Sequence, residues 1–154
     1  MWFFPRKPVR FVAKGRGPSG EWWRLGGWLG RFAEPCALLR TGEWSTRPCF
    51  LELQTGRTNL GARLFAPCEK DVFVFGVAAR TWERVRVLLA DGGRVDAALF
   101  DPPRRSLVPE RYFVAVLPEG TGVRAMEAVE PDGDLLRRRL VGDIGTPCAH
   151  PQGI

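Results

Sequence analysis

The sequence predicts an all-β protein, either an antiparallel β-sandwich or a partly open barrel of roughly eight to ten strands. Glycine (18 residues) and proline (13 residues) are spread along the 154-residue chain, which disfavours long helices. Val85, Val87 and Leu89 alternate with Arg84 and Arg86, the period of a half-buried strand. Turn sequences recur every 8–12 residues, roughly, as expected for consecutive hairpins.

The C-terminal half, residues 72–140, carries the clearest strand pattern. Turns rich in glycine, proline and aspartate separate its apolar segments. An immunoglobulin-like topology is compatible with this half of the chain. The expected strands are Val72–Val77, Arg84–Ala90, Arg94–Phe100, Tyr112–Leu117, Val123–Val129 and Leu135–Leu140. The last contains Arg137, Arg138 and Arg139, which cannot all be hidden, so we expect it at the edge of a sheet.

The N-terminal half contains three further expected strands. In Glu21–Trp28 the neighbouring rings of Trp22 and Trp23 must face opposite sides, so only one can enter the main core. A ring left outside could serve as a stacking platform, whereas packing against the protein is the alternative. Phe50–Gln54 and Ala62–Ala66 are the other two strands, and we expect residues 32–48 to be irregular because Pro35, Gly42 and Pro48 interrupt them.

The charge pattern divides the chain into three parts: a basic aromatic arm (residues 1–20), one all-β domain (residues 21–141) and an irregular tail (residues 142–154). The net charge is +6. Residues 1–31 hold seven basic side chains and one acidic, whereas the remaining residues hold sixteen of each. The whole surplus therefore lies in the N-terminal region, which is a candidate contact for an anionic partner or simply a solvated terminus.

The arm combines apolar rings with cations, as interfacial membrane anchors do. The alternatives are that the rings pack back onto the β core or that the cations bind nucleic acid. The candidate contacts with an anionic surface are Trp2, Phe3, Phe4, Arg6, Lys7, Arg10, Lys14 and Arg16.

Four cysteines are present, without a Cys-x-x-Cys pair, so zinc-ribbon and thioredoxin motifs are not indicated. Cys49 opens one expected strand and Cys68 closes the next, so a hairpin would bring them together. Cys36 would then pair with Cys148. Four reduced thiols in a cytosolic protein are the alternative.

The sequence shows no catalytic constellation, and it favours a protein without enzymatic activity, cofactor or metal. The single histidine, His150, lies in the expected tail, and the carboxylates stand singly beside turns. A Gly15-x-Gly17-x-x-Gly20 match lacks the strand and helix of a dinucleotide site and contains Pro18.

The chain shows no membrane span and no signal peptide. Its apolar stretches fall short of the ~20 residues that a span requires, and Arg6 and Lys7 follow the short N-terminal apolar run rather than precede it. A cytoplasmic location is the simplest expectation, and an extracytoplasmic or envelope-associated one is the alternative.

Several segments resemble small uncharacterised β-rich proteins of high-GC bacteria, which are often exported or tethered to the envelope. The resemblance covers about residues 19–140 and brings no activity with it. It implies a cysteine pair at Cys49 and Cys68 and an envelope location. It is carried by residues 19–25 (SGEWWRL), 49–53 (CFLEL), 85–92 (VRVLLADG), 112–118 (YFVAVLP) and 132–133 (DG).

Three functional hypotheses follow. The first is a non-enzymatic binding or structural module whose protein partner contacts loops such as Asp101–Arg111 or a sheet edge. The second is a peripheral binder of anionic membrane or nucleic acid that acts through the basic arm. The third is a small hydrolase whose carboxylates are brought together by the fold.

Overall fold

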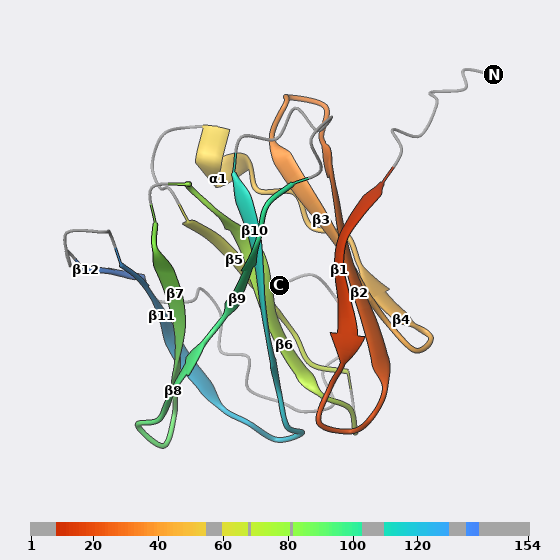
Figure 1. The fold of residues 1–154 in the computed structure, drawn as a ribbon, viewed down its shortest axis with the longest axis vertical. Helices are drawn as coiled ribbons and strands as arrows, with labels where there is room; N and C mark the ends of the chain where they lie inside the picture. Colours follow the sequence, from red (N-terminus) through yellow and green to blue (C-terminus); the bar gives the residue numbers. More distant parts are fainter. Residues whose placement is uncertain are drawn as a thin grey trace.

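A computed structural model of the chain describes residues 9–54, 60–67, 69–80, 82–102, 110–129 and 135–138. Within these residues the chain forms twelve strands and one helical turn, arranged as three antiparallel sheets that are not closed into a barrel (Figure 1). The predicted all-β sandwich is therefore confirmed, and the barrel alternative is not adopted. The tail (residues 142–154), most of the loop 101–111 and much of the arm lie outside the described residues.

The N-terminal sheet is a simple meander of four consecutive strands, each paired with the next. Its order is β1 (Arg10–Arg16), β2 (Trp22–Leu29), β3 (Pro35–Thr41) and β4 (Trp44–Thr46). The chain that we assigned to the arm therefore contributes an edge strand from residue 10 onward.

The remaining two sheets pack together as a sandwich. The central sheet has the order β5 (Leu60–Phe65), β6 (Val72–Ala78), β10 (Arg111–Leu117) and β9 (Ala98–Phe100). The C-terminal sheet has the order β12 (Leu135–Arg138), β11 (Val123–Val129), β7 (Arg84–Leu89) and β8 (Arg94–Asp96).

These two strand orders correspond to the A-B-E-D and G-F-C-C′ sheets of an immunoglobulin-like sandwich, with β5 as strand A and β12 as strand G. The immunoglobulin-like topology that was compatible with residues 72–140 is thus the observed strand pairing. Its first strand begins earlier in the chain, at Leu60. The sequence hallmark of antibody domains, a disulfide between strands B and F, is missing, because neither β6 nor β11 contains cysteine.

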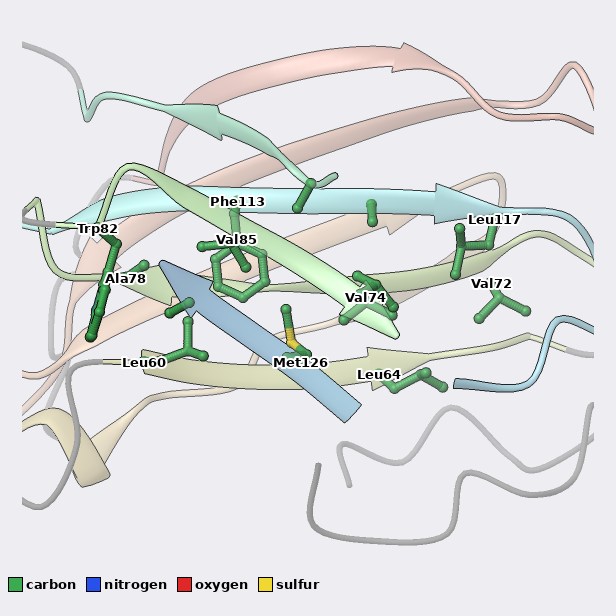
Figure 2. Packing of buried hydrophobic residues seen from close by; sticks show 14 residues of the cluster. Leu60, Leu64, Val72, Val74, Ala78, Trp82, Val85, Phe113, Leu117 and Met126 are labelled. Carbon is green, nitrogen blue, oxygen red and sulfur yellow. The ribbon is translucent and has the colours of Figure 1, made fainter. Parts of the chain in front are cut away.

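The central sheet is buried on both faces, which makes the protein a three-layer structure. Val72, Val74 and Ala78 of β6 belong to the hydrophobic cluster shared with the C-terminal sheet (Figure 2). Phe73 and Phe75 of the same strand belong to the cluster shared with the N-terminal sheet. A strand covered on both sides is expected to be apolar throughout, as Val-Phe-Val-Phe-Gly-Val-Ala is. Each fully buried Phe or Val contributes roughly 1.5–3 kcal/mol.

Arg94–Phe100, which we predicted as one strand, is two strands in different sheets. Arg94–Asp96 pairs with β7, whereas Ala98–Phe100 pairs with β10. Between them, the N–H of Ala97 donates to the carbonyl of Val85 at 2.8 Å. The chain crosses from one sheet to the other at this residue, and the local alternation does not reveal that step.

The segment from residue 32 to residue 48 was predicted as irregular, and this prediction was wrong. Pro35 begins β3, where a missing N–H is tolerated. Gly42, at φ 54°, makes the two-residue turn of the hairpin that pairs Thr41 with Trp44. The residues that we took as strand breakers therefore mark strand ends.

Phe50–Gln54 was predicted as a strand, and it forms the helical turn α1 (Leu51–Gln54) instead. The N–H of Leu53 donates to the carbonyl of Phe50 at 3.2 Å. This turn directs both Phe50 and Leu53 to the cluster between the N-terminal and central sheets. Two apolar residues three positions apart lie on the same face of a helical turn, so the turn can bury both side chains in the core, as alternation in a strand would.

Candidate functional site

The outer face of the N-terminal sheet is built by strand alternation. Along β2, Trp23 and Leu25 point into the core, whereas Trp22 and Arg24 point outward. Trp22 is 54% exposed and Trp23 is 8% exposed. The expected division of the two rings is confirmed, and Trp22 is the ring left outside.

Three cations form a row across three adjacent strands on this face. The register pairs Lys14 of β1 with Arg24 of β2, and Arg24 with Arg40 of β3. All three side chains are exposed, and none of them forms an ion pair with another described residue. Like charges directly opposite one another destabilise a sheet. Folding alone therefore does not account for this row.

Two aromatic rings lie beside the cations. The guanidinium of Arg16 lies 4.8 Å from the ring centroid of Trp22, and that of Arg24 lies 5.7 Å from the ring centroid of Phe11. Phe11 is 47% exposed. Cation–π contacts hold these guanidinium groups on the sheet surface. We refer to Phe11, Lys14, Arg16, Trp22, Arg24 and Arg40 as the basic–aromatic face.

Two described carboxylates beside this sheet form no ion pair with the face. Glu21, directly before β2, pairs with Lys70 at 3.2 Å. Glu43 is exposed in the turn between β3 and β4.

Only part of the predicted anionic-surface contact falls on this face. Lys14 and Arg16 lie on it, and Arg10 is exposed at the start of β1. The predicted contacts Trp2, Phe3, Phe4, Arg6 and Lys7 lie outside the described residues. Trp22 and Arg24 could have been found from their two-residue spacing, but Arg40 joins them only through the pairing of β2 with β3.

The cysteine pairing differs from the predicted one. Cys36 and Cys49 form a disulfide with an S–S distance of 2.08 Å and a Cα–Cα distance of 4.0 Å. The prediction joined Cys49 to Cys68 because it treated Phe50–Gln54 as a strand of a hairpin. Instead, residues 48–50 run back along β3, which places Cys49 opposite Cys36. Cys68 and Cys148 lie outside the described residues, and no described cysteine is free.

A buried carboxylate lies beside this disulfide. Glu34 is 4% exposed, and its Oε2 accepts a hydrogen bond from the N–H of Phe32 at 2.7 Å. Its Oε1 lies 3.9 Å from Sγ of Cys36. Gly30 makes room for this arrangement, since a Cβ there would overlap Oε1 of Glu34. One carboxylate oxygen and the two sulfur atoms all lie within 4.8 Å of one another.

The other buried polar groups stand apart from this cluster. Asp71 accepts hydrogen bonds from the N–H and hydroxyl of Ser19, at 3.0 and 2.8 Å. Glu127 lies on β11, on the far side of the central sheet. These positions do not bring Glu34, Asp71 and Glu127 together as the hydrolase hypothesis would require.

Tyr112 links the central sheet to the cysteine site. Its hydroxyl donates to the carbonyl of Cys36 at 3.0 Å. Burial, and secondarily the charge of Glu110, raises the pKa of Tyr112, so the phenol remains a donor at neutral pH. Burial also raises the pKa of Glu110.

Comparison with protein-family models, curated proteins and solved structures gave no match to this chain. Within the described part of the chain, no helix has the length and apolarity needed to cross a membrane. The site must therefore be interpreted from its own chemistry.

Proposed function

We propose that this protein is a non-enzymatic binding module that binds anionic membrane surfaces through the basic–aromatic face. The observation that carries the proposal is the row of Lys14, Arg24 and Arg40, which are exposed, adjacent and without ion-pair partners among the described residues. An anionic surface would supply the negative charges that the described residues do not place beside these three cations.

The expected energetics suit a peripheral contact. A lysine or arginine near an anionic membrane contributes about 1 kcal/mol. Trp22 and Phe11 are exposed beside these cations, and aromatic rings prefer the headgroup level of a bilayer. Residues 2–7, which precede β1 in the sequence, also combine aromatic rings with cations, three and two of them respectively.

Single-stranded nucleic acid is the alternative polyanion. Nonspecific binding of that kind relies on bases stacking on free aromatic faces. Here the guanidinium groups of Arg16 and Arg24 already cover one side of Trp22 and Phe11. A lipid headgroup layer does not need those ring faces, because its phosphates can bind the guanidinium groups directly. The arrangement therefore favours the membrane.

The disulfide bears on the location of this binding. Disulfides persist in oxidising compartments, so the Cys36–Cys49 bridge supports an extracytoplasmic, envelope-associated location over a cytoplasmic one. The immunoglobulin-like sandwich would then act as the rigid support of the binding sheet.

The test is co-sedimentation with vesicles that contain phosphatidylglycerol, using the triple variant Lys14→Ser, Arg24→Ser, Arg40→Ser. Loss of three cations at about 1 kcal/mol each predicts about a hundredfold weaker binding. The matched control replaces three exposed arginines on strands of the C-terminal sheet, Arg84, Arg94 and Arg124, by serine. It removes the same charge and should retain most of the affinity.

Three outcomes would count against the proposal. Equal losses in the two triple variants would show a nonspecific charge effect. Equal binding to phosphatidylcholine vesicles would show that anionic lipid is not recognised. Binding to an oligothymidylate that is tighter than binding to the vesicles, and that is lost in the Lys14–Arg24–Arg40 variant, would show that the face binds single-stranded nucleic acid instead.

A further inference from the structure

The buried carboxylate of Glu34 has a specific relation to the cysteine pair. It is fixed by the Phe32 N–H on one oxygen and directs the other toward Sγ of Cys36. No described cation pairs with it, although a buried carboxylate gains stability from a nearby positive charge. A disulfide is neutral and supplies none. A cation bound beside the sulfur atoms would supply it.

We propose that reduction of the Cys36–Cys49 disulfide creates a site for a thiophilic divalent cation such as Zn²⁺, with Cys36, Cys49 and Glu34 as its three protein ligands. Thiolate and carboxylate oxygen are both zinc ligands, at about 2.3 Å and 2.0–2.2 Å. In a tetrahedral site such ligand atoms lie roughly 3.4–3.8 Å apart. The three atoms lie within 4.8 Å of one another, and breaking the S–S bond lets the two sulfur atoms move apart to that spacing.

The backbone keeps the two cysteines opposed without the disulfide. The N–H of Ala37 donates to the carbonyl of Pro48, and the N–H of Phe50 donates to the carbonyl of Pro35, both at 2.9 Å. These hydrogen bonds flank Cys36 and Cys49 on both sides. Cys49 is partly exposed, whereas Cys36 is fully buried, so metal and a water ligand can enter from the Cys49 side.

The chemistry balances with an external dithiol as reductant. The dithiol transfers two electrons and two protons to the disulfide, so that it becomes a disulfide itself and leaves two protein thiols. Binding of Zn²⁺ then releases both thiol protons to solvent, because only thiolates coordinate the metal. The site is therefore open to metal in the reduced protein and closed in the oxidised one.

The experiment uses the full chain with Cys68→Ser and Cys148→Ser, so that only the proposed cysteines can bind metal. The reduced protein is titrated anaerobically with Co²⁺, followed by thiolate-to-cobalt absorption, and with Zn²⁺ in competition with a chelating dye. We expect one equivalent to bind the reduced protein and none to bind the oxidised protein. Glu34→Gln keeps the oxygen that accepts the Phe32 N–H, and we expect it to weaken binding by about tenfold or more.

The control variant Glu43→Gln removes an exposed carboxylate from the β3–β4 turn and should leave the affinity unchanged. Equal affinity in Glu34→Gln, a missing thiolate band, or undiminished binding by the oxidised protein would each overturn the proposal. Circular dichroism of the reduced protein completes the test, since a chain that is unfolded without the disulfide and remains so with Zn²⁺ would also overturn it.

Discussion

At the scale of single residues, the cations of the basic–aromatic face lower the stability of the fold, because like charges lie side by side on neighbouring strands. Lys14, Arg24 and Arg40 are direct neighbours across strands, and the described part of the chain gives them no carboxylate partner. Directly opposed like charges cost about 0.2–1 kcal/mol in a sheet. A surface that only had to remain in water would do better with mixed charges at these positions.

Replacing Arg40 by threonine should therefore stabilise the fold while weakening vesicle binding. Arg40→Thr removes one like-charge neighbour and introduces a good strand former, and we expect a gain of about 0.5 kcal/mol in the free energy of unfolding. Urea denaturation at low salt measures it, and the gain should shrink at high salt because the repulsion is screened. Arg94→Thr on β8 is the control, because the residue opposite Arg94 is Leu88. A loss of stability specific to Arg40→Thr would contradict the charge argument.

At the scale of elements, β6 holds the layers together. Its alternate side chains enter the two hydrophobic clusters on opposite faces of the central sheet. The strand tolerates close packing at one point because Gly76 lacks a side chain, and a Cβ there would overlap the carbonyl oxygen of Gly61 on β5. A backbone atom of a paired strand cannot move away by a change of rotamer, as the end of a flexible side chain can.

Gly76→Ala should consequently be strongly destabilising, although it adds one methyl group. Overpacking against backbone forces β5 and β6 apart, and we expect a loss of about 3 kcal/mol. Gly93→Ala is the comparison, because its added Cβ would meet only side chains, Asp91 at 3.0 Å and Leu89 at 3.4 Å, and it should cost less than about 1 kcal/mol. Urea denaturation of both variants gives the two values. Similar values would show that β5 can adapt to the methyl group.

At the scale of the whole molecule, the protein is an immunoglobulin-like sandwich with an additional sheet on its A-B-E-D face. In Figure 1 this additional sheet is the layer of β1 to β4, and the sandwich lies beside it. One polar connection between the two parts is the buried carboxylate of Asp71, which precedes β6 and accepts two hydrogen bonds from Ser19 in the β1–β2 turn.

Asp71→Ala should loosen the N-terminal sheet more than the sandwich. Hydrogen bonds to a charged group contribute about 1.5–3 kcal/mol, and removal of this carboxylate leaves the Ser19 N–H without its acceptor. Hydrogen exchange followed by mass spectrometry should show faster exchange in β1 and β2 than in β7 and β11, relative to the unmodified chain. Asp91→Ala is the control, because it removes the carboxylate that accepts a hydrogen bond from the Gly93 N–H in an exposed turn. A uniform increase in exchange across all three sheets would contradict this division.

Local patterns in the sequence were enough to predict the fold class and most strands of the sandwich. Val123–Val129 was predicted at its observed bounds, and the arginines near residue 138 correctly marked an edge strand. Strand alternation also predicted that one of Trp22 and Trp23 would remain outside the core. These features depend on neighbours within a few positions, where period and turn chemistry operate.

Pairing between distant segments decided the rest. The partner of Cys49, the crossing at Ala97 and the row of Lys14, Arg24 and Arg40 each depend on which strands become neighbours and in what register. The sequence by itself determined that this chain forms antiparallel strands with a basic N-terminal region. Only the tertiary structure decided which cations and which thiols meet, because a strand's pattern selects the face of each side chain but not the strand that pairs with it.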